Sequence, residues 1–190
     1  MPERTEIRDG GILLYDPAFY SRPDADALFA WLRSQIAWRQ EKSRGRPFPR
    51  LTAFVAEEGM EYRYSGATHR GEGWPGELLA VKQKVEQASE AQFNSLLLNR
   101  YRDGRDSIGF HADDEKELGR NPIVASISLG AVRKFVLKHV QSGETLSIHL
   151  AHGSLLVMAG TCQHHWHHGV PKTADDVGER INLTFRNLLI

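Results

Sequence analysis

The sequence predicts an α+β fold, with an antiparallel β-sandwich or barrel as its core and helices packed outside. Two amphipathic helical segments lie before residue 92, and six short segments of alternating polarity follow it. The chain has 190 residues, 41% of them hydrophobic and 25% charged, which is typical of a compact domain and too apolar for general disorder. We therefore expect one domain over residues 1–190, with the helices in residues 1–92 and the β core in residues 93–190.

The two predicted helices each carry one apolar face. In residues 24–37 this face consists of four side chains at helical spacing: Leu28, Phe29, Leu32 and Ile36. Ser21 and Asp24 lie at its start and favour the beginning of a helix. In residues 75–89 Pro75 suits a first helical turn. The apolar face of this second segment consists of Leu78, Val81, Val85 and Ala88.

The period of the sequence changes from helical to alternating after residue 92. Six segments are predicted as strands separated by Gly, Asp and Asn turns: residues 94–101, 122–130, 132–140, 145–150, 154–159 and 180–186. In residues 145–150, for example, Leu146, Ile148 and Leu150 share one side of the strand. Closely spaced strands of this kind predict the sandwich or barrel.

The last predicted strand, residues 180–186, has an unusual polar side. Ile181, Leu183 and Phe185 form a normal buried face. The opposite face consists of Arg180, Asn182, Thr184 and Arg186. At a sheet edge this face would lie in water, whereas inside the domain two buried guanidinium groups would require an anion. A carboxylate ligand suits the second arrangement, because the guanidinium fork binds it through two parallel hydrogen bonds.

A pair of potential metal ligands lies in the segment GFHADDEKE. His111 and Asp113 are two residues apart, so on an extended strand both side chains point to the same side. A third ligand would come from the histidine-rich segment 164–168, which contains His164, His165, His167 and His168. Two histidines and one carboxylate leave about three open positions on iron, as in non-haem Fe(II) oxygenases. Alone, the pair is equally consistent with exposed residues, and the histidines with adventitious metal binding.

Charge is balanced over the whole chain but not along it. The 24 Lys and Arg residues equal the 24 Asp and Glu residues, which excludes a global field that would attract nucleic acid or an anionic membrane. Between Arg33 and Arg50, however, six cations stand against one acid. This basic strip (residues 33–50) is either a solvated loop, since its glycine and prolines oppose regular structure, or a surface that contacts phosphates, with Trp38 and Phe48 available for stacking.

The cysteine content and the hydropathy of the sequence indicate the cellular compartment in which the protein is expected. Cys162 is the single cysteine, which excludes an intramolecular disulfide framework and a four-cysteine zinc site. No apolar run approaches the ~18 residues of a membrane span. The first residues, MPERTEIRDGG, lack the apolar core of a signal peptide. We therefore expect a cytoplasmic protein that does not bind membranes.

Taken together, these segments resemble the AlkB-type Fe(II)/2-oxoglutarate dioxygenases, which oxidatively dealkylate nucleic-acid bases. The resemblance extends from about Arg50 to Arg186 and is closest to the branch that acts on duplex DNA. Five motifs carry it: LNRYRDG (98–104), the pair His111–Asp113, SISLG (126–130), HWHHGVP (165–171) and RINLTFR (180–186). It implies a double-stranded β-helix, or jelly-roll, core with the N-terminal helices packed outside and a nucleotide-recognition segment within residues 1–92.

The resemblance also implies which residues hold the iron and the co-substrate. The metal ligands correspond to His111, Asp113 and His168, which leaves the other three histidines of segment 164–168 as non-ligands. Arg180 corresponds to the arginine that binds the distal carboxylate of 2-oxoglutarate. Further co-substrate contacts correspond to Asn99, Tyr101, Asn182 and Arg186. Because Arg180 and Arg186 are about 20 Å apart along a straight strand, an alternative role for Arg186 is to brace Asp113.

The implied reaction is the oxidative demethylation of N-alkylated DNA bases of the 1-methyladenine and 3-methylcytosine type. It uses Fe(II), 2-oxoglutarate and O₂, releases an aldehyde, succinate and CO₂, and is carried out by a monomer. The target base is flipped out of the helix and stacked, and the resemblance puts Tyr62 and Tyr64 over it. Asp114 and Glu115 would bond its exocyclic amine, or else form a solvated turn, and Arg50 would contact the DNA.

Three other functions stay open from the sequence. The first is the same reaction on RNA or another nucleobase, because contacts to a 2′-hydroxyl leave no local pattern. The second is a β-barrel metal-binding module or zinc hydrolase that uses the same three metal ligands. The third is a non-catalytic nucleic-acid-binding protein that uses the basic strip. The strand at 180–186 argues against the second, since a hydrolase needs no guanidinium to hold a diacid.

Overall fold

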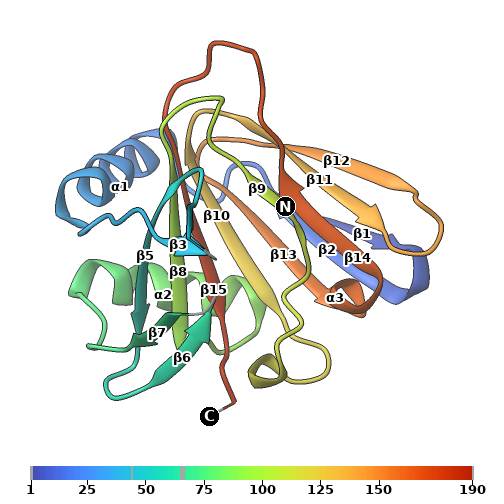
Figure 1. Ribbon diagram of the computed structural model, residues 1–190, viewed down its shortest axis with the longest axis horizontal. Coiled ribbons are helices and arrows are strands. Elements are labelled where there is room, and N and C mark those ends of the chain that lie inside the picture. The colour runs from blue at the N-terminus through green and yellow to red at the C-terminus, as the bar shows by residue number, and fades with distance from the viewer. Residues whose placement is uncertain (1, 44, 65–66, 190) are drawn as a thin grey trace.

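Two antiparallel sheets face each other and form the core of the protein (Figure 1). The computed structural model describes residues 2–43, 45–64 and 67–189, without the side chains at positions 43, 63, 64 and 67. One sheet has seven strands and the other four, and the cavity between them is lined by residues from both. The predicted jelly-roll core is therefore confirmed. In the described ranges no helix has the length and apolar character to cross a membrane.

The larger sheet has the strand order β1-β2-β13-β10-β15-β8-β5. Its strands are β1 (Glu3–Ile7), β2 (Gly11–Asp16), β5 (Leu51–Ala56), β8 (Ser95–Tyr101), β10 (Val124–Gly130), β13 (Ser154–Gly160) and β15 (Arg180–Arg186). β15 lies inside this sheet, where Asn182 pairs with Ser128 of β10 on one side and with Asn99 of β8 on the other. A water-exposed edge position for residues 180–186 is therefore excluded.

The smaller sheet has the order β12-β11-β14-β9. Its strands are β9 (Ile108–His111), β11 (Arg133–His139), β12 (Thr145–Leu150) and β14 (Trp166–Val170). Two hairpins complete the β structure: β3 (Lys42–Ser43) with β4 (Arg46–Pro47), and β6 (Glu61–Tyr64) with β7 (Ala67–Arg70). The expectation that the basic strip lacks regular structure is thus wrong, because Gly45, with φ +77°, supplies the turn that a short hairpin needs.

Helices α1 (Arg22–Gln35) and α2 (Gly76–Ser89) cover the outer face of the larger sheet (Figure 1). As its start residues predict, α1 begins after Ser21, whose hydroxyl accepts the backbone N–H of Asp24 at 3.3 Å. Leu32 of α1 and Leu78 of α2 are fully buried in the cluster that joins the helices to the sheet. The central strand β15 contributes to it Ile181, Leu183 and Phe185. A third helix, α3 (Cys162–His165), is a single turn before β14.

All six predicted strands are present, each with ends within two residues of the expected bounds. The short strand expected around Tyr62 is β6. The strands that sequence reasoning missed are β1, β2, β3, β4, β5, β7 and β14. β1 is exposed along most of its length and β14 is rich in histidine, so neither shows apolar alternation. Because β1, β2 and β5 belong to the larger sheet, residues 1–92 contribute three strands to the β core.

Candidate active site

Two histidines lie directly opposite each other in the smaller sheet. His111, the last residue of β9, pairs in register with His168 of β14, and their ring centroids are 4.4 Å apart. The register shifts just after His168, and a Cβ at Gly169 would lie 3.0 Å from the carbonyl oxygen of Ile108. A glycine at position 169 therefore lets β14 approach β9 closely enough to bring the two rings together.

Asp113 lies two residues beyond β9 and is held by two side chains. Its backbone N–H donates to Oε1 of Gln163 at 2.9 Å, and its Oδ1 accepts a hydrogen bond from Nη2 of Arg186 at 2.6 Å. Burial disfavours the charged carboxylate, but nearby positive charge, first that of Arg186, outweighs it and lowers the pKa of Asp113 to about 2. Asp113 is therefore ionised at neutral pH and has a fixed orientation.

The three predicted metal ligands converge at one point. His111, Asp113 and His168 each offer a ligand atom within 4.8 Å of the other two, and Oδ2 of Asp113 has no hydrogen-bond partner in the described part of the chain. Burial lowers the pKa of His168 to about 3, so its ring is neutral at pH 7 and has a lone pair for a metal. Nδ1 of His111 lies 2.9 Å from the carbonyl oxygen of Gly109, which favours the proton on Nδ1 and leaves Nε2 as the ligand atom.

Arg180 lines the same cavity as the three ligands and is not fully paired. Its side chain is buried, its Nη2 donates to Oγ of Ser128 at 2.9 Å, and its Cζ lies 5.0 Å from the ring centroid of Tyr101. Nε and Nη1 have no hydrogen-bond partner among the residues that the structure describes. Burial lowers the pKa of Arg180, yet a guanidinium in a protein keeps its proton. A buried cation with two free donors calls for an anionic ligand in this cavity.

A chain of buried polar side chains connects Arg50 to β15. Nε of Arg50 donates to Oδ1 of Asn99 at 2.6 Å, and Nδ2 of Asn99 donates to Oδ1 of Asn182 at 3.3 Å. Nδ2 of Asn182 in turn donates to Oγ of Ser126 at 2.7 Å. Arg50, expected among the exposed cations of the basic strip, is only 3% exposed, because it directly precedes β5, which pairs with β8 beside Asn99. Contact between Arg50 and DNA stays a prediction.

The residues predicted to hold the target base have different surroundings. Tyr62 is buried and stacks on Phe54 with ring centroids 6.0 Å apart. Its pKa is raised, first by burial and then by the charge of Glu115. Glu115 is half-buried, and its Oε2 has no hydrogen-bond partner among the described residues, whereas Asp114 is exposed. Tyr64 lies in β6, but its side chain is outside the described residues.

Only one histidine of segment 164–168 enters this cavity, and it is His168. His164 and His167 are exposed, and His165 is stacked on His139. Sequence reasoning did not identify the residues that hold the site in place, such as Gln163, which anchors Asp113. Ser126 and Ser128, which support Asn182 and Arg180, follow the same pattern as the polar face of β15: they alternate on a buried strand. That alternation is the signal that could have identified them.

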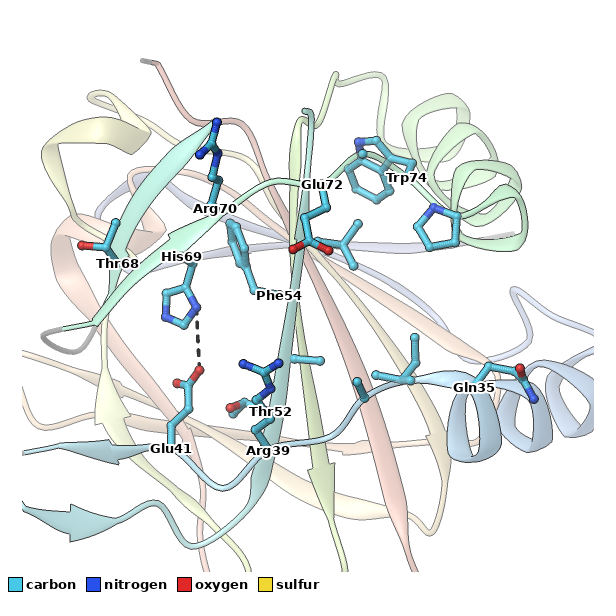
Figure 2. A pocket seen from close by; sticks show the side chains of 16 residues that line it. Gln35, Arg39, Glu41, Thr52, Phe54, Thr68, His69, Arg70, Glu72 and Trp74 are labelled. Carbon is cyan, nitrogen blue, oxygen red and sulfur yellow. Dashed lines mark ion pairs between the residues drawn. The ribbon is translucent and has the colours of Figure 1, made fainter. Parts of the chain in front are cut away.

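A larger pocket of about 810 Å³ lies outside the cavity, beside β5 and the β6–β7 hairpin (Figure 2). Nδ1 of His69 lies 3.7 Å from Oε1 of Glu41 in its wall. The pocket is also lined by Arg39 and Glu72, which point toward its centre from opposite sides in Figure 2. None of the predicted site residues lines this pocket. Its cations and acids balance, so it lacks the unpaired charge that distinguishes the cavity with Arg180.

Comparison with known proteins places the chain in a family. The sequence matches the 2OG-Fe(II) oxygenase superfamily over residues 12–186. It is 34% identical over 198 residues to DNA oxidative demethylase ALKBH2 of Bos taurus, covering 96% of this chain and 71% of the relative. It is 38% identical over 186 residues to alpha-ketoglutarate-dependent dioxygenase alkB homolog 3 of Bos taurus, covering 90% of this chain and 64% of the relative.

A solved structure has a similar fold. The solved structure of OsALKBH1 matches with a TM-score of 0.72 at 16% identity, covering 97% of this chain and 100% of that one. The sheet arrangement and the sequence matches therefore agree. The chain belongs to the 2OG-Fe(II) oxygenase superfamily and, within it, to the AlkB family of dioxygenases, which use Fe(II), 2-oxoglutarate and O₂.

Proposed function

We propose that this dioxygenase demethylates N-alkylated bases in DNA, of the 1-methyladenine and 3-methylcytosine type, and so repairs alkylation damage. One observation carries the proposal: a single cavity contains three converging metal ligands and a buried arginine with two unpaired nitrogens. The relative named DNA oxidative demethylase supports DNA as the substrate. The geometry of the cavity supports the same reaction class independently of that name.

The donor set fits Fe(II). His111 and His168 would supply imidazole nitrogens, and Asp113 would supply Oδ2, the oxygen without a hydrogen-bond partner among the described residues. Arg186 holds Oδ1 of the same carboxylate at 2.6 Å, so it acts as a positioning residue that leaves Oδ2 for the metal. Two histidines and one carboxylate suit iron with open positions better than a closed structural zinc site.

The opposite charge in the cavity fits 2-oxoglutarate. Arg180 would bind the distal carboxylate through Nε and Nη1, while Ser128 keeps Nη2 in place and the Tyr101 ring supports the guanidinium. Asn99 and Asn182 form the adjoining wall and are fixed by their bonds to each other and to Arg50. Because Arg186 is engaged with Asp113, we assign it to the metal ligand rather than to the co-substrate.

When bound, iron and 2-oxoglutarate supply the oxidation: O₂ is consumed, 2-oxoglutarate becomes succinate and CO₂, and the alkyl group leaves as an aldehyde. The chain binds and orients the reactants and excludes water. Apolar side chains complete the cavity wall for this purpose: Leu97, Ile108, Phe135, Met158 and Val170. A protein nucleophile is not needed, and burial raises the pKa of Cys162 to about 12, so its thiol stays protonated.

A flipped base would lie beside Tyr62. The Tyr62 ring already stacks on Phe54, which gives it a fixed orientation for stacking on a base. An N-alkylated adenine or cytosine carries positive charge, and the buried Oε2 of Glu115 is an acceptor without a hydrogen-bond partner in the described part of the chain. We assign Glu115 to the exocyclic amine, Asp114 to the solvated rim, and Tyr64 to a further contact with the nucleic acid. Arg50 is only 3% exposed and donates to Asn99, so we assign it to the support of the cavity wall rather than to the DNA.

The direct test is turnover on methylated oligonucleotides with Fe(II), 2-oxoglutarate and O₂. The substrates are single- and double-stranded DNA and RNA with one 1-methyladenine or 3-methylcytosine, and both the repaired base and succinate are measured. We expect one succinate per base repaired in DNA. His168→Ala should abolish turnover and leave the fold intact, whereas His167→Ala, the exposed neighbour, should retain it. Full activity of His168→Ala would contradict the ligand assignment.

The same assay separates the alternatives. Repair restricted to RNA would replace the DNA proposal with RNA demethylation and keep the iron chemistry. Succinate formation without repair of any tested base would keep the dioxygenase and reject the alkylated-base substrate. Loss of all dependence on 2-oxoglutarate would favour a hydrolase. We also propose that the protein is a monomer, which light scattering of the purified chain tests, and that it acts in the cytoplasm.

A further inference from the structure

A second cluster of potential metal ligands lies outside the catalytic cavity. Asp9, His139 and His165 each offer one ligand atom, and these atoms lie within 4.8 Å of one another. The residues come from three separate segments: the short 3-10 turn Arg8–Gly10, the end of β11, and α3. We propose that they form a second metal site, for a divalent first-row cation of the zinc type.

The backbone that presents Asp9 is held in place by other residues. The hydroxyl of Thr161 donates to the carbonyl oxygen of Asp9, and the indole Nε1 of Trp166 donates to the carbonyl oxygen of Arg8 at 3.1 Å. Nε of Arg8 also lies 2.7 Å from Oε2 of Glu144, next to the β11–β12 turn. The carboxylate of Asp9 is therefore presented by a segment with few degrees of freedom, which lowers the entropic cost of binding an ion.

The two histidines have free or displaceable donor atoms. Nε2 of His139, a buried residue, lies 2.8 Å from Oδ2 of Asp9. The ring of His165 is nearly parallel to that of His139, at 24° and 6.2 Å between centroids. The side chain of His165 makes no hydrogen bond or ion pair to another described residue, so a ring nitrogen is available without breaking a contact. Asp9 and His139 thus need little movement, and His165 completes the site.

The metal-free hydrogen bonds define what binding must change. The backbone N–H of Ser142 lies 3.1 Å from Nδ1 of His139, so without metal the ring proton is on Nε2 and is donated to Asp9. A metal at Nε2 moves this proton to Nδ1, where the Ser142 hydroxyl, at 2.9 Å, can accept it. The peptide N–H of Ser142 then has to turn away. Residues 140–143 are exposed, so this turn can adjust.

The donor atoms indicate the class of ion. Two imidazole nitrogens and one carboxylate oxygen suit Zn²⁺, Co²⁺ or Ni²⁺, whereas Ca²⁺ and Mg²⁺ prefer oxygen ligands and Cu(I) prefers sulfur. Oδ2 of Asp9 and Nε2 of His139 are 2.8 Å apart. This distance has to increase only slightly for both atoms to bind one tetrahedral ion with bonds of about 2.0–2.2 Å. The side chain of Asp9 is 46% exposed, so water can occupy the remaining position.

The metal would connect the N-terminal turn Arg8–Gly10 to β11 and to α3. α3, which contains His165, runs directly into β14, which contains the catalytic-cavity residue His168. A metal bound by Asp9, His139 and His165 would therefore stabilise the start of β14 from outside the cavity. It is predicted to raise the melting temperature, because an ion that binds the folded state alone stabilises it.

Zinc titration of the metal-free full chain tests the proposal. Zn²⁺ is added in competition with a chromophoric chelator, and the number of ions per chain is measured. We expect two ions for the unchanged protein. We expect one for His111→Ala/His168→Ala, which removes the catalytic ligands, and none when His165→Ala is added to this pair. His164→Ala is the matched control, because that exposed neighbour bonds Asn121 and lies outside the cluster; it should leave both ions.

Thermal denaturation gives a second readout that does not depend on turnover. Zinc should raise the melting temperature of His111→Ala/His168→Ala, and adding His165→Ala should remove that rise. Because His165 is half-buried and makes no side-chain hydrogen bond to a described residue, its replacement should not unfold the metal-free chain. Absence of bound zinc from His111→Ala/His168→Ala, or retention of zinc and of the thermal shift in the triple variant, would overturn the proposal.

Discussion

The two faces of β15 are both buried and chemically opposite. Every residue of Arg180–Arg186 is buried, yet one face is wholly apolar and the other carries two arginines, an asparagine and a threonine. The apolar face packs in the buried cluster that joins helices α1 and α2 to the larger sheet. The polar face lines the cavity between the sheets. Burial alone therefore does not determine which residues a strand position accepts. The residue type depends on whether that position faces packed apolar side chains or the cavity.

The difference lies in how each face is compensated. The apolar face gains stability from the removal of apolar surface from water. The polar face is compensated by specific partners: Arg186 by Asp113, Asn182 by Ser126, and Arg180 only in part by Ser128. The incomplete pairing of Arg180 marks the point where a ligand is required. The apolar face should thus control stability, and the polar face should control ligand binding.

The largest expected effect is on the apolar face. Phe185→Ala should lower the free energy of unfolding by about 3–5 kcal/mol, the usual cost of a cavity in place of a buried aromatic ring. Phe185 is fully buried and lies 5.9 Å from Phe93 and 6.3 Å from Trp74, measured between ring centroids. Urea denaturation of the metal-free chain measures the change, with Phe185→Leu as the milder control. A large rise in the KM for 2-oxoglutarate in the folded variant would show that the two faces are not separable.

The second effect is on the polar face. Arg180→Ala should raise the KM for 2-oxoglutarate by about 100-fold, because each charge-assisted hydrogen bond contributes roughly 1.5–3 kcal/mol and some attraction to the cavity remains. Steady-state kinetics with varied 2-oxoglutarate measure it. Arg180→Lys keeps the charge but loses the fork and should give an intermediate value. An unchanged dependence on 2-oxoglutarate in Arg180→Ala would remove the co-substrate anchor from the mechanism.

A third effect concerns pH and the metal-free protein. The pKa of His168 is about 3 in the folded protein, against an ordinary value of 6.5, so protonation of this ring between pH 6.5 and 3 favours the unfolded chain. The free energy of unfolding is therefore unaffected by His168 above pH 6.5 and decreases as the pH falls toward 3, with a slope of at most about 1.4 kcal/mol per pH unit. His168→Gln cannot take up the proton and should flatten the pH dependence of the unfolding free energy in this window. Equal slopes in chelator-treated unchanged and variant proteins would mean that His168 is not buried as a neutral ring.

The sequence predicts features that depend on local period and misses those that depend on long-range pairing. Alternation in residues 180–186 predicts both faces of β15, because it is a property of neighbouring residues. The spacing of His111 and Asp113 correctly predicts that their side chains converge, but not on one strand, since β9 ends at His111. Arg50 is the counterexample. It is the last cation of the basic strip, but the pairing of β5 with β8 brings it to Asn99, 49 residues away, and no local pattern contains that register.

The metal ligands show the same division. His168 is one of four histidines within five residues. The register of β14 with β9 brings His168 opposite His111, whereas His165 ends α3 and stacks on His139. β1 and β14 lack apolar alternation because one is an exposed edge strand and the other is filled with histidines. The sequence motif of a family selects His168, but the chain's own alternation does not.

The smallest predicted effect comes from Thr184, a residue of the polar face whose hydroxyl is already bonded to another protein side chain. The hydroxyl of Thr184 donates to Oδ1 of Asn182 at 2.8 Å, within the polar face. Thr184→Val keeps the shape and removes this bond, so we expect a loss of about 1 kcal/mol in unfolding free energy and a rise of no more than a few-fold in the KM for 2-oxoglutarate. Thr184→Ser, which retains the hydroxyl, is the matched control for the hydrogen bond. If Thr184→Val changes the KM as much as Arg180→Ala does, the whole polar face binds the co-substrate as a unit, and Arg180 cannot be singled out as its anchor.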